Sequence, residues 1–302
     1  LLRYAELALD LAKAGGGNRC VLYDSTLGEA AEARQRSEND LRAAIERGQL
    51  VVHYQPIIDL DDMRMAGAEA LLRWNHPERG LVAPGEFIPL AEEIGLIDAV
   101  GLWVLETACA QLATWQENGQ RYTLSVNVSG KQIPDGLPIE HIEACVSGYG
   151  IDAARLALEI TEGVLMENLD AALSWLEAVH AIGCRIYLDD FGTGYSSLSY
   201  LKRFPVDTLK VDRSFVRDMH GDDSDRALVE TIIAMARSLR MNVVAEGVEN
   251  ALQLESLHGM GCRFAQGYFF APPLAIDELD ARFTETAGPS RPTLPTPDAT
   301  PA

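Results

Sequence analysis

Short apolar runs and amphipathic stretches alternate along most of this chain. From Leu50 onward the runs have the length and composition of strands, and between them apolar residues recur at helical spacing. The expected strands are residues 50–60, 63–72, 122–128, 156–161, 185–189, 208–211, 242–245 and 263–267. The expected helices are residues 39–47, 87–118, 139–149, 169–182, 197–203, 225–239, 251–260 and 276–284. Strands that alternate with helices in this way are typical of a parallel sheet.

The first two expected strands lie very close together in the sequence. Only Asp61 and Asp62 separate them, and so short a connection makes a hairpin, whose strands are antiparallel. Eight strands in roughly 240 residues fit a (β/α)8 barrel of the TIM type. We therefore expect an α/β fold, a TIM-like barrel with an antiparallel first strand. A doubly wound open sheet is the alternative, and it fits less well because no G-x-G-x-x-G pattern follows the first strand.

The two ends of the chain differ from the barrel region. Residues 1–24 read as a helix, a glycine stop and a short strand, which is too little to fold alone. Residues 25–37 are rich in Ala, Glu and Arg, and we expect a helical linker there. Residues 288–302 contain five prolines and are expected to be a disordered tail. The barrel would span residues 38–287, and the chain, which begins without Met, looks like a fragment of a longer protein.

The composition argues against some classes of partner. With 25 Lys and Arg against 45 Asp and Glu, the 302-residue chain has a formal net charge of −20. That charge argues against nucleic acid and against an anionic membrane surface, since both attractions depend on basic side chains. An anionic substrate would need arginine, lysine or bound metal to offset the field of the protein.

The cysteines and the apolar runs bear on location. The five cysteines, at positions 20, 109, 145, 184 and 262, are odd in number, scattered, and form no C-x-x-C pair. We expect reduced thiols, mostly in the core, in a cytoplasmic protein. No apolar run reaches transmembrane length and no signal peptide is evident. Segments outside this chain could still anchor a longer protein to a membrane.

One stretch, residues 185–198, combines an apolar strand with candidate chemistry. It places Asp189 and Asp190 side by side at the strand end, directly before Gly192 and Gly194. Neighbouring strand residues point to opposite faces, so the two carboxylates can share a site only where the backbone turns, which the glycines permit. Paired acids there suit divalent cations that face a phosphate. A capped turn, in which Asp and Gly are common, is the alternative for this stretch alone.

Polar residues recur at the ends of the expected strands. Because the carboxyl ends of barrel strands converge on one face, one cup would collect Glu69, Asn127, Glu159, Glu162, Asp189, Asp190, Lys210, Glu246, Glu249 and Gln266. So many acids cannot stay ionised together without cations. Oxygen ligands without His or Cys indicate Mg²⁺ or Mn²⁺ rather than Zn²⁺. Their number favours a two-metal site suited to phosphoester displacement, with Lys210 as a point charge or proton-transfer group beside the attacking water.

Each of these residues also has a simpler explanation. Glu159 or Glu162 could cap a turn, Lys210 could be a buried ion-pair partner, and Asn127 could be a turn residue. Taken together these explanations fail, because every residue would have to fall at a strand end by chance. The six histidines, at positions 53, 76, 141, 180, 220 and 258, show no shared placement and are interpreted as surface or core residues.

Motifs at the strand ends carry a family resemblance. They are YQPI at 54–57, EALLRW at 69–74, VNVS at 126–129, LEITE at 158–162, LDDFGTG at 188–194, LKVD at 209–212, AEGVE at 245–249 and AQGY at 265–268. Jointly they are specific, whereas any one tripeptide would be weak. Over about residues 38–287 the chain resembles the EAL family of cyclic di-GMP phosphodiesterases. Residues 1–24 resemble the C-terminal end of a GGDEF (diguanylate cyclase) domain without its signature loop, so cyclase activity cannot reside in this chain.

The EAL resemblance implies a hydrolase that opens cyclic di-GMP to linear pGpG with two Mg²⁺ or Mn²⁺ ions. Ca²⁺ is expected to inhibit, because its longer bonds and looser geometry would spread a two-metal site. By resemblance, the ligands of the first metal are Glu69, Asn127, Glu159 and Asp189. Asp189 bridges to the second metal, with Asp190 and Glu246 at or near it. Lys210 orients or deprotonates the nucleophilic water, and Glu246 assists. The resemblance implies further roles in substrate binding for Gln55, Arg73, Glu249 and Gln266, and in anchoring the loop after Asp190 for Glu162.

The resemblance also implies partners and leaves alternatives open. It implies a bacterial second-messenger protein that forms a homodimer and has GGDEF-like and sensory domains upstream. Residues 190–195 are the expected regulated loop. A receptor that binds cyclic di-GMP with little turnover is the second functional hypothesis. A carboxylate-pair glycosidase is a third, from fold alone, but that chemistry does not call for Lys210 and Asn127.

Overall fold

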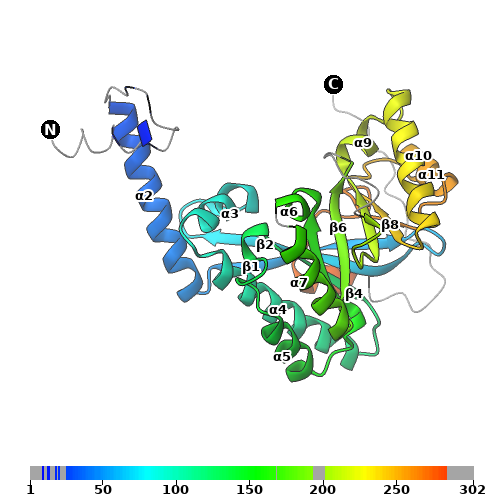
Figure 1. Cartoon of the computed structure of the whole chain (residues 1–302), viewed down its shortest axis with the longest axis horizontal. Coiled ribbons are helices and arrows are strands. Elements are labelled where there is room, and N and C mark those ends of the chain that lie inside the picture. Colours follow the sequence, from blue (N-terminus) through cyan, green and yellow to red (C-terminus); the bar gives the residue numbers. More distant parts are fainter. Residues whose placement is uncertain are drawn as a thin grey trace. The chain divides into compact units, whose positions relative to one another are not determined.

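The computed structural model describes residues 25–167, 169–192 and 201–283, together with residues 9, 12, 13, 18 and 20 (Figure 1). Most of the expected GGDEF-like segment 1–24, the expected tail 288–302, and residues 193–200 lie outside the described residues. The last of these gaps includes part of the expected regulated loop and most of the expected helix 197–203. The chain divides into two compact units, Leu1–Val51 with Trp74–Leu96, and Val52–Arg73 with Ile97–Ala302.

The second unit contains the strands of a closed barrel. Around the barrel the order is β1-β9-β8-β7-β6-β5-β4-β2, and β2 pairs with β1 to close it. The bounds are β1 Leu50–Asp59, β2 Arg64–His76, β4 Thr123–Asn127, β5 Leu156–Thr161, β6 Arg185–Phe191, β7 Thr208–Val211, β8 Asn242–Ala245 and β9 Phe264–Ala265. The neighbouring strands in the barrel order β2-β4-β5-β6-β7-β8-β9 are parallel, whereas β1 is antiparallel to β9. The expected barrel and its antiparallel first strand are confirmed.

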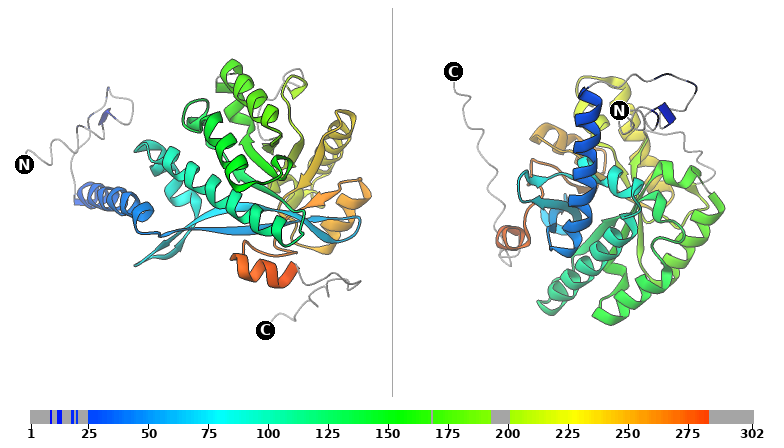
Figure 2. Two further views of the ribbon diagram at one scale, coloured as in Figure 1. Left: turned by 90° about the horizontal axis from the view of Figure 1, so that it is seen from below. Right: turned by 90° about the vertical axis from the view of Figure 1, so that its left-hand side faces the viewer.

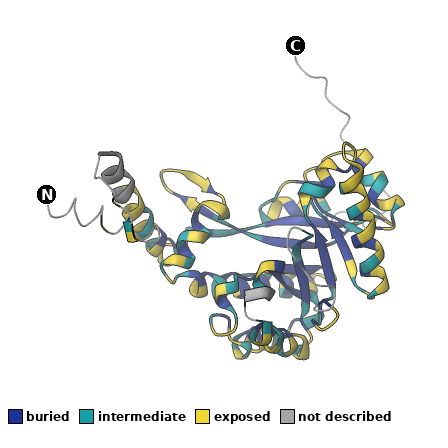
Figure 3. Cartoon of the chain, turned by 45° about the horizontal axis from the view of Figure 1, so that its top comes forward, coloured by how far each residue is buried: buried dark blue, intermediate teal, exposed yellow. Residues whose placement is uncertain are grey.

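Helices lie outside the strands of this unit in both views of Figure 2. Their bounds are α4 Ile97–Glu117, α5 Ile139–Tyr149, α6 Glu162–Glu167, α7 Leu169–Ile182, α9 Arg213–Asp218, α10 Asp223–Ser238, α11 Ala251–Gly259 and α12 Ile276–Phe283. The strands are buried and the outer helix faces are exposed (Figure 3), as expected where helices cover a parallel sheet. None of the described helices has both the length and the apolar character required to span a membrane.

The first unit contains α2 (Ser25–Glu46), the end of β2, β3 (Gly80–Val82) and α3 (Pro84–Glu93). β3 pairs antiparallel with the last residues of β2. Trp74 packs edge-on against Phe87 with ring centroids 5.8 Å apart. Its indole Nε1 donates to Oε1 of Gln49 at 3.2 Å. These contacts give the unit a small aromatic core of its own.

Several element boundaries differ from the sequence predictions. The single helix expected over 87–118 is two helices, because Gly95, next to the C-cap residue Ile94 of α3, adopts a φ of +71°, a conformation that ends helices. α2 passes through residue 37 without a break, so the expected linker and the helix after it are one helix, and the domain boundary at residue 38 stays a prediction. The short elements β3, α6 and α9 are absent from the prediction because three to six residues carry little periodicity.

β6 carries an irregularity next to its paired acids. Its register with β7 shifts between Leu188 and Phe191, and Asp190 adopts a φ of +54°. Few non-glycine residues occupy that region, but Asp does so more often than most. The backbone therefore departs from regular strand geometry at Asp190 itself, two residues before Gly192. This departure frees the two neighbouring carboxylates from the strict alternation of a strand.

Candidate active site

Seven strands bring seven polar side chains to one rim of the barrel. Six lie at or near the end of a strand, and Glu69 lies within β2, near the end of its pairing with β4. Pairing of β4 with β5 sets Asn127 opposite Glu159, and pairing of β5 with β6 sets Thr161 opposite Asp189. Because parallel strands run in the same direction, their carboxyl ends share one rim. We call the following residues the strand-end cluster: Glu69, Asn127, Glu159, Asp189, Lys210, Glu246 and Gln266.

Lys210 lies at the centre of the strand-end cluster. Its side chain is fully buried. Its Nζ lies 2.7 Å from Oε1 of Glu246, 2.9 Å from Oε2 of Glu159, 3.0 Å from Oε2 of Glu69 and 3.5 Å from Oδ1 of Asp189. One ammonium thus serves four carboxyl groups, so it cannot neutralise them if all four are ionised.

Two amide side chains orient the acids of the cluster. Nδ2 of Asn127 donates to Oε1 of Glu69 at 2.8 Å. Nε2 of Gln266 donates to Oε2 of Glu69 at 2.7 Å and to Oε1 of Glu246 at 3.0 Å. Both oxygens of Glu69 are therefore engaged, which fixes the orientation of this carboxylate and favours its ionised form.

Burial and charge separate the pKa values of the cluster. Burial raises the pKa of Glu69, but the Lys210 ammonium and the two amide donors outweigh it and hold that pKa below its ordinary value. Burial, reinforced by the charge of Glu69, raises the pKa of Glu159 well above its ordinary value. Burial also raises the pKa of Glu246 to about 8, against the opposing effect of Lys210. Burial would lower the pKa of Lys210, but the surrounding carboxylates hold it well above its ordinary value.

Two buried carboxylate oxygens of the cluster accept no hydrogen bond from the described residues. They are Oε1 of Glu159 and Oδ1 of Asp189, the second of which has only its ion-pair contact with Nζ of Lys210 at 3.5 Å. Buried carboxylate oxygens normally have hydrogen-bond partners, so this pair points to a ligand of positive charge. Carboxylate and amide oxygens are the donors that Mg²⁺ and Mn²⁺ prefer. The residues present therefore fit a divalent cation held by oxygen.

A second pair of acids lies beside the cluster. The carboxyl groups of Asp190 and Asp212 lie close enough for each to affect the pKa of the other. Burial, with the charges of Asp189 and Asp212, raises the pKa of Asp190 to about 6. Asp212 also accepts from the backbone N of Ser214 at 3.0 Å. The sequence analysis did not single out Asp212, although it carries the same signal as the others, a carboxylate directly after a strand.

Glu162 connects the end of β5 to the end of β6. Its side chain is buried, and its Oε2 accepts from the backbone N of Gly192 at 3.3 Å. Gly192 has a φ of +101°, and a Cβ built there would lie 3.0 Å from the ring of Phe215. Glu162 thus holds the start of the loop that follows Asp190 at a position that requires glycine.

Three further residues expected at the site lie outside the strand-end cluster. Gln55 is buried and its Nε2 donates to the carbonyl oxygen of Ala271 at 3.3 Å. Arg73 is part-buried; burial lowers its pKa, opposed by the charges of Tyr268 and Glu69. Glu249 is exposed. The described interactions therefore link Arg73 to the cluster through its charge, and the site roles of Gln55 and Glu249 stay predictions.

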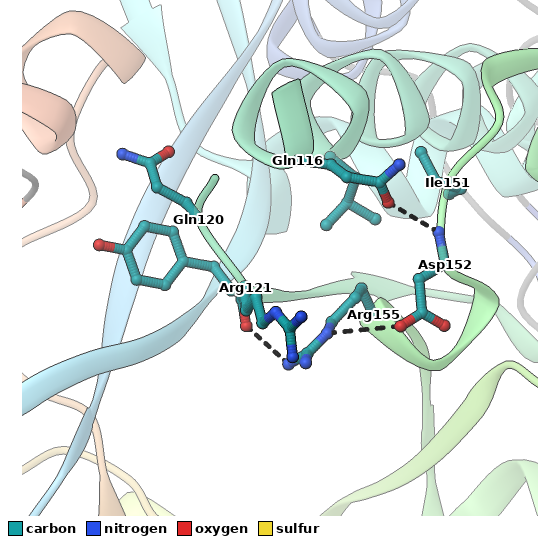
Figure 4. A pocket seen from close by; sticks show the side chains of 8 residues that line it. Gln116, Gln120, Arg121, Ile151, Asp152 and Arg155 are labelled. Carbon is teal, nitrogen blue, oxygen red and sulfur yellow. Dashed lines mark hydrogen bonds and ion pairs between the residues drawn. The ribbon is translucent and has the colours of Figure 1, made fainter. Parts of the chain in front are cut away.

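A cavity of about 250 Å³ lies at the opposite ends of the strands (Figure 4). Arg155 donates there to the carbonyl oxygen of Arg121 at 2.6 Å. Oε1 of Gln116 accepts from the backbone N of Asp152 at 3.0 Å. The lining residues precede β4 and β5, and none belongs to the strand-end cluster. Active sites of such barrels lie at the carboxyl ends of the strands, so the cluster is the candidate active site.

Comparisons with known proteins identify the family of the chain. Residues 38–273 match the family model described as EAL domain. The chain is 41% identical over 280 residues to the bifunctional diguanylate cyclase/cyclic di-GMP phosphodiesterase MucR of Pseudomonas aeruginosa, covering 92% of this chain and 41% of MucR. It is 41% identical over 281 residues to the cyclic di-GMP phosphodiesterase NbdA of the same species, covering 93% of this chain and 36% of NbdA. The chain therefore spans well under half the length of these curated relatives.

Solved structures show the same similarity. The PaMucR phosphodiesterase in its c-di-GMP complex is 43% identical with a TM-score of 0.78, and the alignment covers 81% of this chain and 99% of that chain. The EAL enzyme Bd1971 in its cAMP- and cyclic-di-GMP-bound form is 32% identical with a TM-score of 0.77, covering 84% of this chain and 70% of that chain.

Proposed function

Because this chain belongs to the EAL domain family, we propose that it is a metal-dependent phosphodiesterase that hydrolyses cyclic di-GMP to linear pGpG. One observation carries the proposal. Four carboxyl groups converge on Lys210, and two of their buried oxygens are left without a hydrogen-bond partner among the described residues. The similarity to a phosphodiesterase whose structure contains c-di-GMP supports the choice of substrate.

The acids of the cluster would hold the metal ions. A first ion would be held by Glu69, Asn127, Glu159 and Asp189, and a second by Asp189, Asp190 and Glu246, with Asp212 beside them. When bound, divalent cations supply positive charge that lowers the pKa of a water molecule and stabilises the charge developing on a phosphate. Mg²⁺ and Mn²⁺ suit this ligand set. Ca²⁺ should inhibit, because its longer bonds and looser geometry separate the ligands.

Lys210 and Glu246 would act on the attacking water. An ammonium has three donors and no acceptor, and three carboxylate oxygens now lie within 3.0 Å of Nζ. Lys210 would orient the water by exchanging one of these contacts for a hydrogen bond to the water oxygen. Glu246, whose Oε1 lies 2.7 Å from Nζ, would accept the proton once bound cations favour its ionised form, because without them burial raises its pKa to about 8. In the reaction the water oxygen forms a bond to phosphorus, one P–O ester bond breaks, and the leaving oxygen takes up a proton. The product then has one free phosphate end and one free hydroxyl end.

Other residues would position the substrate. Arg73 brings a guanidinium near the rim of a strongly acidic protein, where it would offset the charge of a dinucleotide phosphate. Gln266 links Glu69 to Glu246 and would complete the pocket. Gln55 and Glu249 are proposed as substrate contacts at its edge. Glu162 would hold the loop after Asp190 through its contact with Gly192.

We extend the proposal to the protein around this unit. Residues 1–24 would belong to a GGDEF-like domain upstream, which the bifunctional name of MucR supports. Residues 38–287 would be the phosphodiesterase domain, and residues 288–302 a disordered tail. The described cysteines are free thiols, in line with a reducing cytoplasm. A homodimer is proposed as well, and sedimentation of the purified chain would test it.

One assay tests the activity. The purified chain is incubated with cyclic di-GMP in Mg²⁺, Mn²⁺ or EDTA, and pGpG is quantified by chromatography. We expect pGpG in either metal and none in EDTA. Full activity in EDTA would contradict the metal-dependent mechanism. Tight calorimetric binding of cyclic di-GMP without pGpG release in either metal would show that the chain is a receptor.

A further inference from the structure

A mixed cluster of ligand-type side chains lies away from the barrel rim, between α4 and α5. Glu106 comes from α4, and His141 and Cys145 lie one turn apart on the same face of α5. One ligand atom from each residue lies within 4.8 Å of the other two. Nε2 of His141 is 3.4 Å from Oε1 of Glu106. We call Glu106, His141 and Cys145 the helix-pair site.

The helix-pair site differs from an ordinary surface ion pair. Nε2 of His141 is buried and has no hydrogen-bond partner among the described residues. Cys145 is also buried, with 6% of its surface exposed. His258 and Asp61 form a similar pair at 3.5 Å with both side chains more than half exposed, whereas in the helix-pair site Glu106 is 51% exposed and His141 only 32%. A buried imidazole nitrogen beside a buried thiol and a carboxylate is an arrangement typical of transition-metal ligands.

We propose that Glu106, His141 and Cys145 bind a thiophilic divalent cation, Zn²⁺ being the best fit, with water in the fourth position. Tetrahedral zinc has Zn–N of about 2.0–2.1 Å and Zn–S of about 2.3 Å, so its ligand atoms lie roughly 3.3–3.8 Å apart. Side-chain rotations that move the ligand atoms by about 1 Å would bring their spacing, at most 4.8 Å in the structure, into this range. The Cys145 thiol loses its proton to solvent when sulfur binds the metal, and His141 binds as the neutral imidazole.

Cys109 supports the site without being one of its ligands. It is fully buried on α4, and its thiol lies close enough to that of Cys145 for each to affect the pKa of the other. The Cys109 S–H would donate to the sulfur of Cys145 once that sulfur is metal-bound. Burial, with Glu106 nearby, raises the pKa of the free Cys145 thiol.

The helix-pair site lies between two helices that precede strands of the candidate active site, so a bound metal ion would stabilise this part of the fold. α4 is followed in the chain by β4, which ends at Asn127, and α5 is followed by β5, which carries Glu159. A metal ion bound by both helices would hold the two helices before these strands together. It would stabilise the folded chain, because the unfolded chain does not present the three ligands together. The strand-end cluster offers only oxygen and ammonium groups, so the two sites select different metals.

Cobalt substitution tests the proposal directly. Metal-stripped wild-type chain, held in excess Mg²⁺ and reductant, is titrated with Co²⁺ while the near-ultraviolet thiolate-to-cobalt charge-transfer band is recorded. We expect one equivalent of Co²⁺ to produce the band and Zn²⁺ to remove it. Cys145→Ser should abolish the band. His141→Ala should weaken Co²⁺ binding by at least about tenfold, since even loss of an outer hydrogen-bond partner costs that much.

Controls separate this site from the rest of the chain. His258→Ala removes a histidine with the same carboxylate spacing but no thiol, so it should leave the band and the affinity unchanged. Asp189→Asn alters the strand-end cluster and should also leave the band unchanged. Zn²⁺ should raise the thermal midpoint of wild type but not of His141→Ala, which checks the site if Cys145→Ser fails to fold. A missing band in wild type, or a band retained in Cys145→Ser, would overturn the proposal.

Discussion

The clearest test of the strand-end cluster is the replacement of Lys210 by Met, which keeps the length of the side chain and removes its charge. In the structure Nζ lies within 3.0 Å of three carboxylate oxygens and 3.5 Å from a fourth. Without the ammonium these acids would be buried together with no cation. We therefore expect Lys210→Met to destabilise the metal-free protein strongly.

The size of this effect follows from the surroundings of Lys210. Removing one partner of a buried ion pair costs about 3–5 kcal/mol, because a buried charge is left uncompensated. Glu159 and Glu246 already have raised pKa values, so they can take up protons in the variant, which limits the loss to the lower end, about 3 kcal/mol. Arg226→Met is the matched control. It removes an exposed pair with Glu230, for which about 0.5 kcal/mol or less is expected.

Urea unfolding in EDTA and in saturating Mn²⁺ measures the loss of stability in the metal-free and in the metal-bound protein. Bound Mn²⁺ replaces the lost positive charge, so the difference between wild type and Lys210→Met should shrink in Mn²⁺. In Mn²⁺ without urea, pGpG release by Lys210→Met should be slower than that of wild type by about two to four orders of magnitude, the usual contribution of a positioned acid–base group. Calorimetric binding of cyclic di-GMP should persist. Unchanged stability in EDTA would refute the charge argument, and lost substrate binding would assign Lys210 to phosphate recognition.

Three further predictions concern the same rim of the barrel. Asp189→Asn alters a proposed ligand of both metals, so Mn²⁺ affinity by calorimetry and pGpG release should fall together; separate effects would argue against a bridging role. Glu162→Ala removes the acceptor for the Gly192 N–H and should lower kcat more than it raises KM, whereas wild-type kcat would show that the loop does not depend on Glu162. Mg²⁺ and Mn²⁺ should restore activity to chelated protein and Ca²⁺ should not, and equal rates in Ca²⁺ would contradict the proposed geometry.

The barrel could be predicted because its strands repeat one simple signal. Apolar runs such as 156–161, 208–211 and 242–245 agree with the observed strands to the residue, and the two-residue connection at Asp61 and Asp62 fixed the direction of the first strand. Helix boundaries that depend on the backbone conformation of a single residue were harder to predict from the sequence. The stop at Gly95 depends on a positive φ that a helical apolar pattern does not reveal.

The strand-end cluster could be foreseen because parallel strands deliver their carboxyl ends to one rim. What the sequence did not reveal is which contact each residue makes there. The central position of Lys210 among four acids depends on the register of β7 with its neighbours. The pairing of Asp190 with Asp212 depends on the irregular backbone of β6 at Asp190. His141 could not be linked to a site from the sequence, which predicted an ordinary surface or core residue. The proposed helix-pair site depends on the packing of α4 against α5, which brings His141 next to Glu106 and Cys145.

The two proposed metal sites can be separated in one experiment because their ligands differ in chemistry. EDTA should strip both the strand-end cluster, which binds through oxygen, and the helix-pair site, which binds through nitrogen, sulfur and oxygen. Adding back Mg²⁺ alone should restore pGpG release while the thermal midpoint stays below that of zinc-loaded protein, since the hard cation does not satisfy the Cys145 sulfur. Adding Zn²⁺ after Mg²⁺ should then raise the midpoint further in wild type and not in His141→Ala. If Mg²⁺ alone restored the whole midpoint, the helix-pair site would have no part in stability.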